Sequence, residues 1–165
     1  MSGIRAKDTK PELIIRKALH ANGYRYRVNQ RRLPGSPDIV LRKFNAVIFV
    51  HGCFWHGHDC PLFKLPKTRT EFWRAKISTN QQRDERNVSR LRSEGWRVCT
   101  VWECALRGSV SESRFEFLLD TIVSWVHGEQ PTVEIDRLFV ALANSELNLH
   151  DSAGLLAAES SRSLL

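Results

Sequence analysis

VHGCFWHGHDCP, the stretch from Val50 to Pro61, holds three histidines, two cysteines, a phenylalanine, a tryptophan and an aspartate within twelve residues. Core strands do not need so many potential metal ligands, and ordinary surface loops do not need an adjacent Phe-Trp pair. The stretch continues a β-rich run, Ala46 to Val50. We therefore expect a strand that ends in a metal-binding loop carrying aromatic side chains.

The segments around this loop predict a small mixed sheet flanked by helices, an α/β or α+β fold class. Thr9 is a suitable N-cap and Pro11 suits the first turn of a helix that ends at Gly23. The short runs 38–41 and 46–50 are joined by a polar turn and predict a hairpin. The remaining expected elements are strands at 24–28 and 96–102 and helices at 70–94 and 112–127.

The hydrophobic patterning weakens beyond Gly128. We expect one domain over residues 1–128 and a peripheral C-terminal tail over residues 129–165. No apolar run approaches the roughly 20 residues that a membrane helix needs. The first twelve residues are polar and lack a signal-peptide core, so a cytoplasmic location and no contact with a membrane are expected.

Charge is distributed unevenly along the 165 residues. Residues 1–110 hold 22 Lys and Arg against 9 Asp and Glu, whereas residues 111–165 hold 3 against 9. The basic part is suited to binding a polyanion, most simply nucleic acid. When bound to DNA, the protein would be associated with the nucleoid. A solvated basic surface without a partner explains the same charge equally well.

Three soft or borderline metal ligands, Cys53, His58 and Cys60, form a C-x4-H-x-C pattern. Cys104 follows the expected strand at 96–102 and would complete a tetrahedral zinc site. Four protein ligands leave no open position, so this zinc would be structural and would tie the loop to a distant strand. The alternative is buried thiols with a surface histidine; Cys99 is assigned to the core.

A second group of polar residues suggests a hard cation and a general base. Asp38 opens one β-run and His51 ends the next, so antiparallel pairing would bring them to the same end of the sheet. Mg²⁺ prefers carboxylate, water and phosphate oxygens, and histidine is a good general base near neutral pH. Glu12 on the first expected helix could add a second carboxylate through a water molecule. Taken singly, each residue also has a plain structural explanation: Asp38 as a turn residue, Glu12 as a helix N-terminal charge and His51 as a strand-end group.

Four segments, LPGSPDIVL, VIFVHGCFWHGHDC, TRTEFW and GWRVCTVWECALRG, resemble the very short patch repair (Vsr) DNA mismatch endonucleases in the family's order. The resemblance runs from about Ile4 to Gly108. It implies a restriction-endonuclease-like fold with a modified PD-(D/E)xK core. It also implies a nick 5′ to the thymine of a T:G mismatch that arises from deaminated 5-methylcytosine. Functional links to a DNA cytosine-5 methyltransferase and to mismatch-repair proteins follow from the same resemblance, and we expect a monomer.

The resemblance implies roles for individual residues of the catalytic site. Asp38 resembles the carboxylate that binds Mg²⁺, and His56 resembles the general base. His51 and Glu12 resemble supports of metal-bound water. Val50 stands where threonine is found in the family; because the metal contact there is a backbone carbonyl, we expect the change to be tolerated. The structural zinc ligands implied by the resemblance are Cys53, His58, Cys60 and Cys104.

The resemblance also implies residues that contact DNA. Phe54, Trp55 and Trp73 resemble aromatic side chains that wedge into the duplex beside the mismatch. Unstacking a base step costs a few kcal/mol, and less at a mismatch that is already weakly stacked. Lys76 and Asn80 resemble mismatch-contacting positions, and Met1 falls where the family has an intercalating methionine in an N-terminal arm.

Three other functions are compatible with parts of the pattern. A restriction-type endonuclease would cut both strands of fully paired DNA. A non-catalytic, zinc-stabilised DNA-binding protein would bind without cutting, although the presence of Asp38, His51 and His56 together argues against it. A histidine-metal nuclease of the HNH type would use the loop histidines as direct ligands of the catalytic metal.

Overall fold

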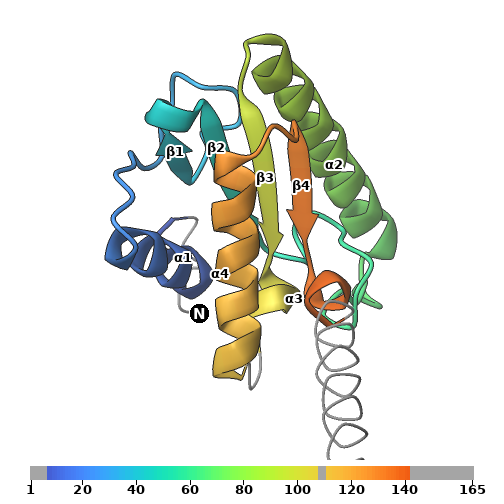
Figure 1. Ribbon diagram of the computed structural model, residues 1–165. Coiled ribbons are helices and arrows are strands. Elements are labelled where there is room, and N and C mark those ends of the chain that lie inside the picture. The colour runs from blue at the N-terminus through green and yellow to red at the C-terminus, as the bar shows by residue number, and fades with distance from the viewer. Residues whose placement is uncertain (1–6, 108–110, 142–165) are drawn as a thin grey trace, which may run out of the picture.

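The computed structural model describes residues 7–107 and 111–141, and its centre is a four-stranded mixed sheet (Figure 1). The strands are β1 (Ile39–Leu41), β2 (Ala46–His51), β3 (Arg97–Trp102) and β4 (Thr132–Ile135), in that spatial order. β1 and β2 are antiparallel, whereas β2, β3 and β4 run parallel to one another. The predicted hairpin and the predicted mixed sheet are confirmed.

Helices cover both faces of the sheet (Figure 1). They are α1 (Lys10–Ala21), α2 (Thr70–Ser93), the short α3 (Glu103–Leu106) and α4 (Glu112–His127), with a 3-10 turn, η1 (Arg42–Phe44), between β1 and β2. α1 and α4 pack on one face of the sheet, and α2 lies on the other. None of the helices in the described ranges is long and apolar enough to cross a membrane.

Alternation along the strands divides the core into two layers. Side chains such as Ile39, Ile48 and Val101 point toward α1 and α4 and belong to the larger apolar cluster. Val47 and Val98 point the other way and pack with Leu91 of α2. α2 is otherwise polar, so its contact with the sheet is small and a cleft can open beside it.

Capping residues fix where the two outer helices begin. The Thr9 side chain accepts a hydrogen bond from the Glu12 amide and donates one to the Glu12 carboxylate at 2.8 Å, a reciprocal cap. Ser111 caps α4 through the amide of Arg114. Both starts agree with the sequence prediction.

Two sequence predictions are wrong in this region of the fold. Residues 24–28 form no strand; they contribute one isolated bridge, Arg27 with Val40. Residues 129–141 are not a peripheral tail, because β4 pairs with β3 and the side chains of Ile135 and Val140 are fully buried. β4 has only four residues and two of them are exposed, so its sequence carries little periodic signal.

Candidate active site and metal centre

A cleft of about 960 Å³ opens between α1, the β1–β2 hairpin and α2. We call it the carboxylate cleft. Its walls include five titratable side chains: Glu12, Asp38, His51, His56 and Asp84. The sequence predicted the first four as site residues, and the fold adds Asp84 from α2.

Asp38 immediately precedes β1, and its Oδ2 accepts a hydrogen bond from the backbone N–H of Val50 at 2.8 Å. Within the described residues, Oδ1 accepts no hydrogen bond. Burial, and to a smaller extent the Glu12 carboxylate, raise the pKa of Asp38 to about 6, against the opposing effects of the Val50 amide, Arg16 and His56. A carboxylate held in this way gains from a nearby cation, which fits the donor set that Mg²⁺ prefers.

His56 is held by a partner that the sequence analysis missed. Its Nδ1 lies 2.5 Å from Oδ2 of Asp84, a residue of α2. The Asp84 carboxylate can only accept, so Nδ1 donates and the Nε2 lone pair is left as the basic atom. Burial is the largest single effect on Asp84 and opposes its ionisation, but the hydrogen bond from His56 and the charges of His56, His51 and Arg83 together keep the pKa of Asp84 below its ordinary value.

A signal for Asp84 was present in the sequence. The apolar side of α2 contains Ile77, Val88 and Leu91, and Asp84 lies seven residues from both Ile77 and Leu91. Seven residues are close to two helical turns, so this carboxylate shares the face that packs on the protein. An aspartate on an apolar helix face needs a partner, and here the partner is His56.

His51 stacks on His56, with ring centroids 3.8 Å apart and planes 6° from parallel. Burial, with a smaller effect of His56, lowers the pKa of His51 to about 3. His51 is therefore neutral near pH 7, and its ring packs against the ring of His56. One donor atom each from His51, His56 and Asp84 also lies within 4.8 Å of the others, a spacing that a metal ion could use.

Glu12 is buried and already bonded on both carboxylate oxygens. Oε1 accepts from the Thr9 hydroxyl, and Oε2 accepts from the Asp8 amide at 3.0 Å and from Arg16 at 2.9 Å. The same Arg16 guanidinium donates to the backbone carbonyl of Asp38 at 3.2 Å. Arg16, which the sequence analysis did not single out, thus ties α1 to the residue that holds the cleft carboxylate.

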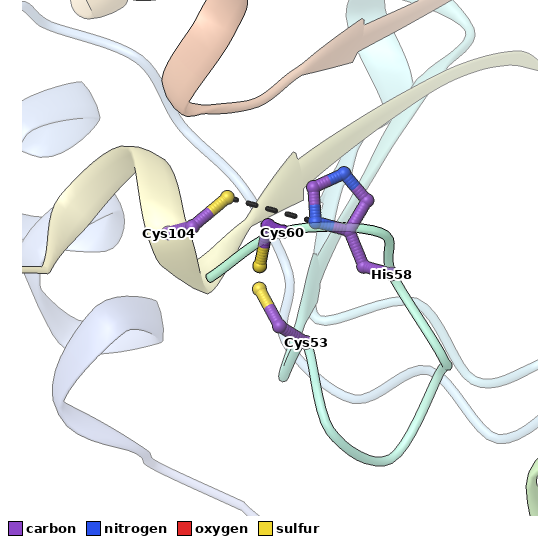
Figure 2. Close-up of side chains that lie close together, drawn as sticks. All are labelled: Cys53, His58, Cys60 and Cys104. Atoms are coloured by element: carbon purple, nitrogen blue, oxygen red, sulfur yellow. Dashed lines mark hydrogen bonds between the residues drawn. The ribbon is translucent and has the colours of Figure 1, made fainter. Parts of the chain in front are cut away.

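Cys53, His58, Cys60 and Cys104 converge as predicted, and we call this group the sulfur cluster. Their donor atoms all lie within 4.8 Å of one another. Figure 2 shows three of the side chains reaching inward from the loop after β2, while Cys104 approaches from α3. Three sulfurs and one imidazole form a donor set typical of structural zinc.

The surroundings of the sulfur cluster also fit a metal. Cys53 and Cys104 are buried, and burial raises the pKa of both thiols. Metal binding requires thiolates, and a cation beside them offsets the cost of burying their charge. Cys99 lies in the core between β2 and β4, away from the cluster, as expected.

Aromatic side chains gather on the loop and on the first turn of α2. Trp73 lies beside both Phe54 and Trp55, with ring centroids 5.4 and 6.0 Å away, and Phe54 and Trp55 are themselves 5.2 Å apart. All three are half-buried, so they form one partly exposed aromatic cluster. Lys76 is exposed on the next turn.

Asn80 differs from the other residues expected to contact DNA, because it is buried. Its side-chain amide donates to the carbonyl of Trp55 at 2.9 Å. In this conformation Asn80 fixes the aromatic loop against α2 rather than presenting its amide to solvent. Met1 lies outside the described residues.

Comparison with known proteins places this chain among DNA-cutting enzymes. Residues 1–62 match the family model described as DNA mismatch endonuclease Vsr. The chain is 47% identical over 136 residues to the DNA mismatch endonuclease Vsr of Escherichia coli K12, which covers 82% of this chain and 86% of that protein. Similarity extends to the Type II nicking enzyme V.XorIIP of Xanthomonas oryzae, 47% identical over 73% of this chain and 89% of the relative. The Type II nicking enzyme V.NmeAIP of Neisseria meningitidis is 49% identical over 65% of this chain and 76% of the relative.

Proposed function

The chain belongs to the family of Vsr DNA mismatch endonucleases, and from this premise we propose that it nicks DNA 5′ to the thymine of a T:G mismatch. The mismatches would arise by deamination of 5-methylcytosine, and the nick would begin very short patch repair. One observation carries the proposal: a single loop, residues 52–60, bears His56, the aromatic pair Phe54-Trp55 and three residues of the sulfur cluster. The same short segment therefore carries the proposed general base, the proposed intercalating side chains and three proposed metal ligands.

His56 is the proposed general base. The Asp84 carboxylate holds Nδ1–H, so the free Nε2 takes a proton from the attacking water, and stacked His51 keeps the ring in plane. The water oxygen forms a bond to phosphorus as the bond to the 3′-oxygen breaks. The departing 3′-oxygen takes a proton from solvent water, so the products are a 3′-hydroxyl and a 5′-phosphate.

Asp38 and the backbone carbonyl of Val50 would hold Mg²⁺. When bound, the ion would neutralise charge on the scissile phosphate and on the departing oxygen. Asp38 is ready for this role because its buried carboxylate has one oxygen fixed by Val50 N–H. We propose that Glu12 does not contact the metal directly, since both of its carboxylate oxygens already accept hydrogen bonds from α1 and its N-terminal cap.

Selection of the mismatch is assigned to the aromatic cluster. Phe54 and Trp55 would enter the duplex from the loop, supported by the Trp73 ring that both of them contact. Unstacking costs less at a T:G pair than at a normal pair, so the wedge favours the mismatch. Lys76 is free to reach the DNA, whereas Asn80 acts by holding the carbonyl of Trp55.

The wider setting follows from the same premise. The substrate would be double-stranded DNA that shares a recognition site with a cytosine-5 methyltransferase, and the protein would work as a monomer in the cytoplasm. Because β4 belongs to the central sheet, we propose an endonuclease domain that extends to at least residue 141.

A restriction-type activity on paired DNA is the alternative function. The names of two similar proteins describe nicking enzymes, and a nick in one strand favours the mismatch proposal over double-strand cutting. A nuclease of the HNH type would need a metal between His51, His56 and Asp84. The hydrogen bond between His56 and Asp84 gives these residues a role without one.

A nicking assay tests the proposal. Duplexes with one T:G pair in randomised flanking sequence are compared with T:A and C:G duplexes, with Mg²⁺, for the wild type and Asp38→Ala. We expect a single nick 5′ to the mismatched thymine, absent in the variant. Asp59→Ala is the matched control, because Asp59 is an exposed carboxylate of the same loop. Equal cutting of T:A duplexes would replace the proposal by the restriction-type function.

A further inference from the structure

The two ring nitrogens of His58 face different groups. Nδ1 lies 3.6 Å from the sulfur of Cys104, inside the sulfur cluster (Figure 2). Nε2 lies 3.5 Å from Oδ2 of Asp136, a residue that follows β4. Both side chains are largely buried, with 13% and 26% of their surfaces exposed, so few water molecules compete for this contact.

The segment after β4 also reaches a second ligand of the cluster. The backbone N–H of Arg137 lies beside the thiol of Cys104. N–H groups of this kind stabilise thiolates around a bound metal. Two successive residues, Asp136 and Arg137, thus contact two different members of the sulfur cluster.

Trp102 covers one face of the His58 ring. The two rings stack with centroids 4.2 Å apart and planes 14° from parallel. Trp102 is in turn fixed by a hydrogen bond from its Nε1 to the carboxylate of Glu134, at 3.1 Å, in β4. β4 and the residues that follow it therefore restrain His58 through both its ring face and its ring edge.

From these contacts we propose that Asp136 is the outer-shell carboxylate of the metal centre. With a metal bound at Nδ1, His58 would donate its Nε2–H to the Asp136 carboxylate, whose Oδ2 lies 3.5 Å from that nitrogen, and this contact would fix the tautomer whose Nδ1 lone pair faces the metal. Metal-bound histidines commonly have such a carboxylate partner, which orients the ring and makes the ligand more basic. Asp136 is a positioning residue, and it makes the segment after residue 128 part of the metal centre.

A purely structural role for Asp136 is the competing explanation. Its Oδ1 accepts a hydrogen bond from the amide of Phe139 at 2.7 Å, which is an N-cap contact for the turn that follows. The two oxygens face different partners, so the two roles can be separated. Asp136→Asn keeps a carbonyl oxygen for the cap but directs an N–H donor at His58, and Asp136→Ser keeps the cap but cannot reach the ring.

The first test measures zinc affinity of the full chain by competition with a chromophoric chelator. We expect Asp136→Asn and Asp136→Ser to bind zinc with about 10- to 100-fold lower affinity than the wild type. Asp59→Asn removes one negative charge next to His58 in the sequence but from an exposed side chain, and it should stay within about 2-fold of the wild type. An equal loss in Asp59→Asn would assign the effect to net charge and overturn the proposal.

The second test observes His58 itself by long-range ¹H–¹⁵N NMR of the zinc-loaded protein. We expect a metal-bound Nδ1 and a slowly exchanging Nε2–H, with fast exchange of that proton in Asp136→Asn. An unchanged Nε2–H in the variant, or zinc affinity equal to that of the wild type, would overturn the proposal. A wild type that binds no zinc would do so as well.

The inference rests on the zinc part of the proposed function and not on the reaction. Both readouts are independent of nicking, so a failed mismatch assay leaves them interpretable. A zinc-saturated Asp136→Asn should nick at close to the wild-type rate, because Asp136 does not line the carboxylate cleft.

Discussion

The sulfur cluster and the carboxylate cleft share one loop but differ in nearly every physical property. The cluster is closed, has soft donors and includes two buried cysteines, Cys53 and Cys104. The cleft is open, has hard oxygen donors, and keeps one oxygen of Asp38 free of partners among the described residues. A site saturated with protein ligands can only stabilise, whereas an open site can bind a substrate. Under the proposed function, the sulfur cluster would hold the loop so that His56 can act in the carboxylate cleft.

The largest expected effect comes from breaking the closed site. Cys104→Ser should abolish zinc binding and lower the free energy of unfolding by on the order of 5 kcal/mol or more, because the proposed metal would join the loop to α3. Metal content and thermal unfolding of the purified protein measure it. Cys99→Ala is the control, a buried thiol outside the cluster, and should cost about 1 kcal/mol. An equal decrease in the free energy of unfolding in both variants would show that Cys104 contributes no more than a core cysteine.

Next in size is removal of the base from the open site. His56→Ala should slow single-turnover nicking by about 10³-fold, equivalent to about 4 kcal/mol, with little change in stability. Asp84→Asn should slow it less, by about 10-fold, because the ring loses its acceptor but keeps its position. Should His56→Ala nick at the wild-type rate, another group would have to be the base.

A third variant should show that the buried, charged Asp38 carboxylate lowers the free energy of unfolding. Burial raises the pKa of Asp38 from 3.8 to about 6, so the charged form is disfavoured in the folded state. The folded protein binds the proton more tightly than the unfolded chain, and stability due to this group is lost as pH rises from 4 to 6. Without Mg²⁺, Asp38→Asn should therefore stabilise the protein at pH 8 by about 3 kcal/mol at most.

The pH dependence provides the check on that variant. The gain in stability should vanish below about pH 4, where Asp38 is protonated in both states. Denaturant unfolding at pH 4 and pH 8 measures it, and Asp59→Asn, at an exposed carboxylate, is expected to show no such difference. A wild type as stable as Asp38→Asn at pH 8 would show that Asp38 carries no burial cost. Nicking by the wild type should decline below about pH 6.

The smallest expected effect concerns the aromatic cluster that borders both sites. Trp55→Ala should weaken binding to a T:G duplex by about 10-fold and binding to paired DNA by less, since the wedge acts mainly where stacking is already weak. Fluorescence anisotropy at fixed salt measures both. Phe139→Ala, a partly exposed aromatic of the C-terminal segment, is the control. Equal weakening on both duplexes would make Trp55 a general DNA contact.

Local signals in the sequence were sufficient for most of the fold. The Thr9 cap, the hairpin and the long helix α2 were predicted because each depends on neighbouring residues. The strand expected at 24–28 failed because alternation alone provides no partner, and only Arg27 finds one. β4 was missed because a four-residue strand is defined by the sheet that it joins, not by its own pattern.

The sequence by itself determined which chemistry is available: a sulfur-rich ligand set, a carboxylate, free histidines and aromatic side chains on one loop. Only the tertiary structure decided how these groups are paired. It joined His56 to Asp84 across 28 positions, His58 to Asp136 across 78, and Asn80 to the carbonyl of Trp55. Residue type is local information, but orientation, burial and the resulting pKa values depend on contacts between segments far apart in the chain.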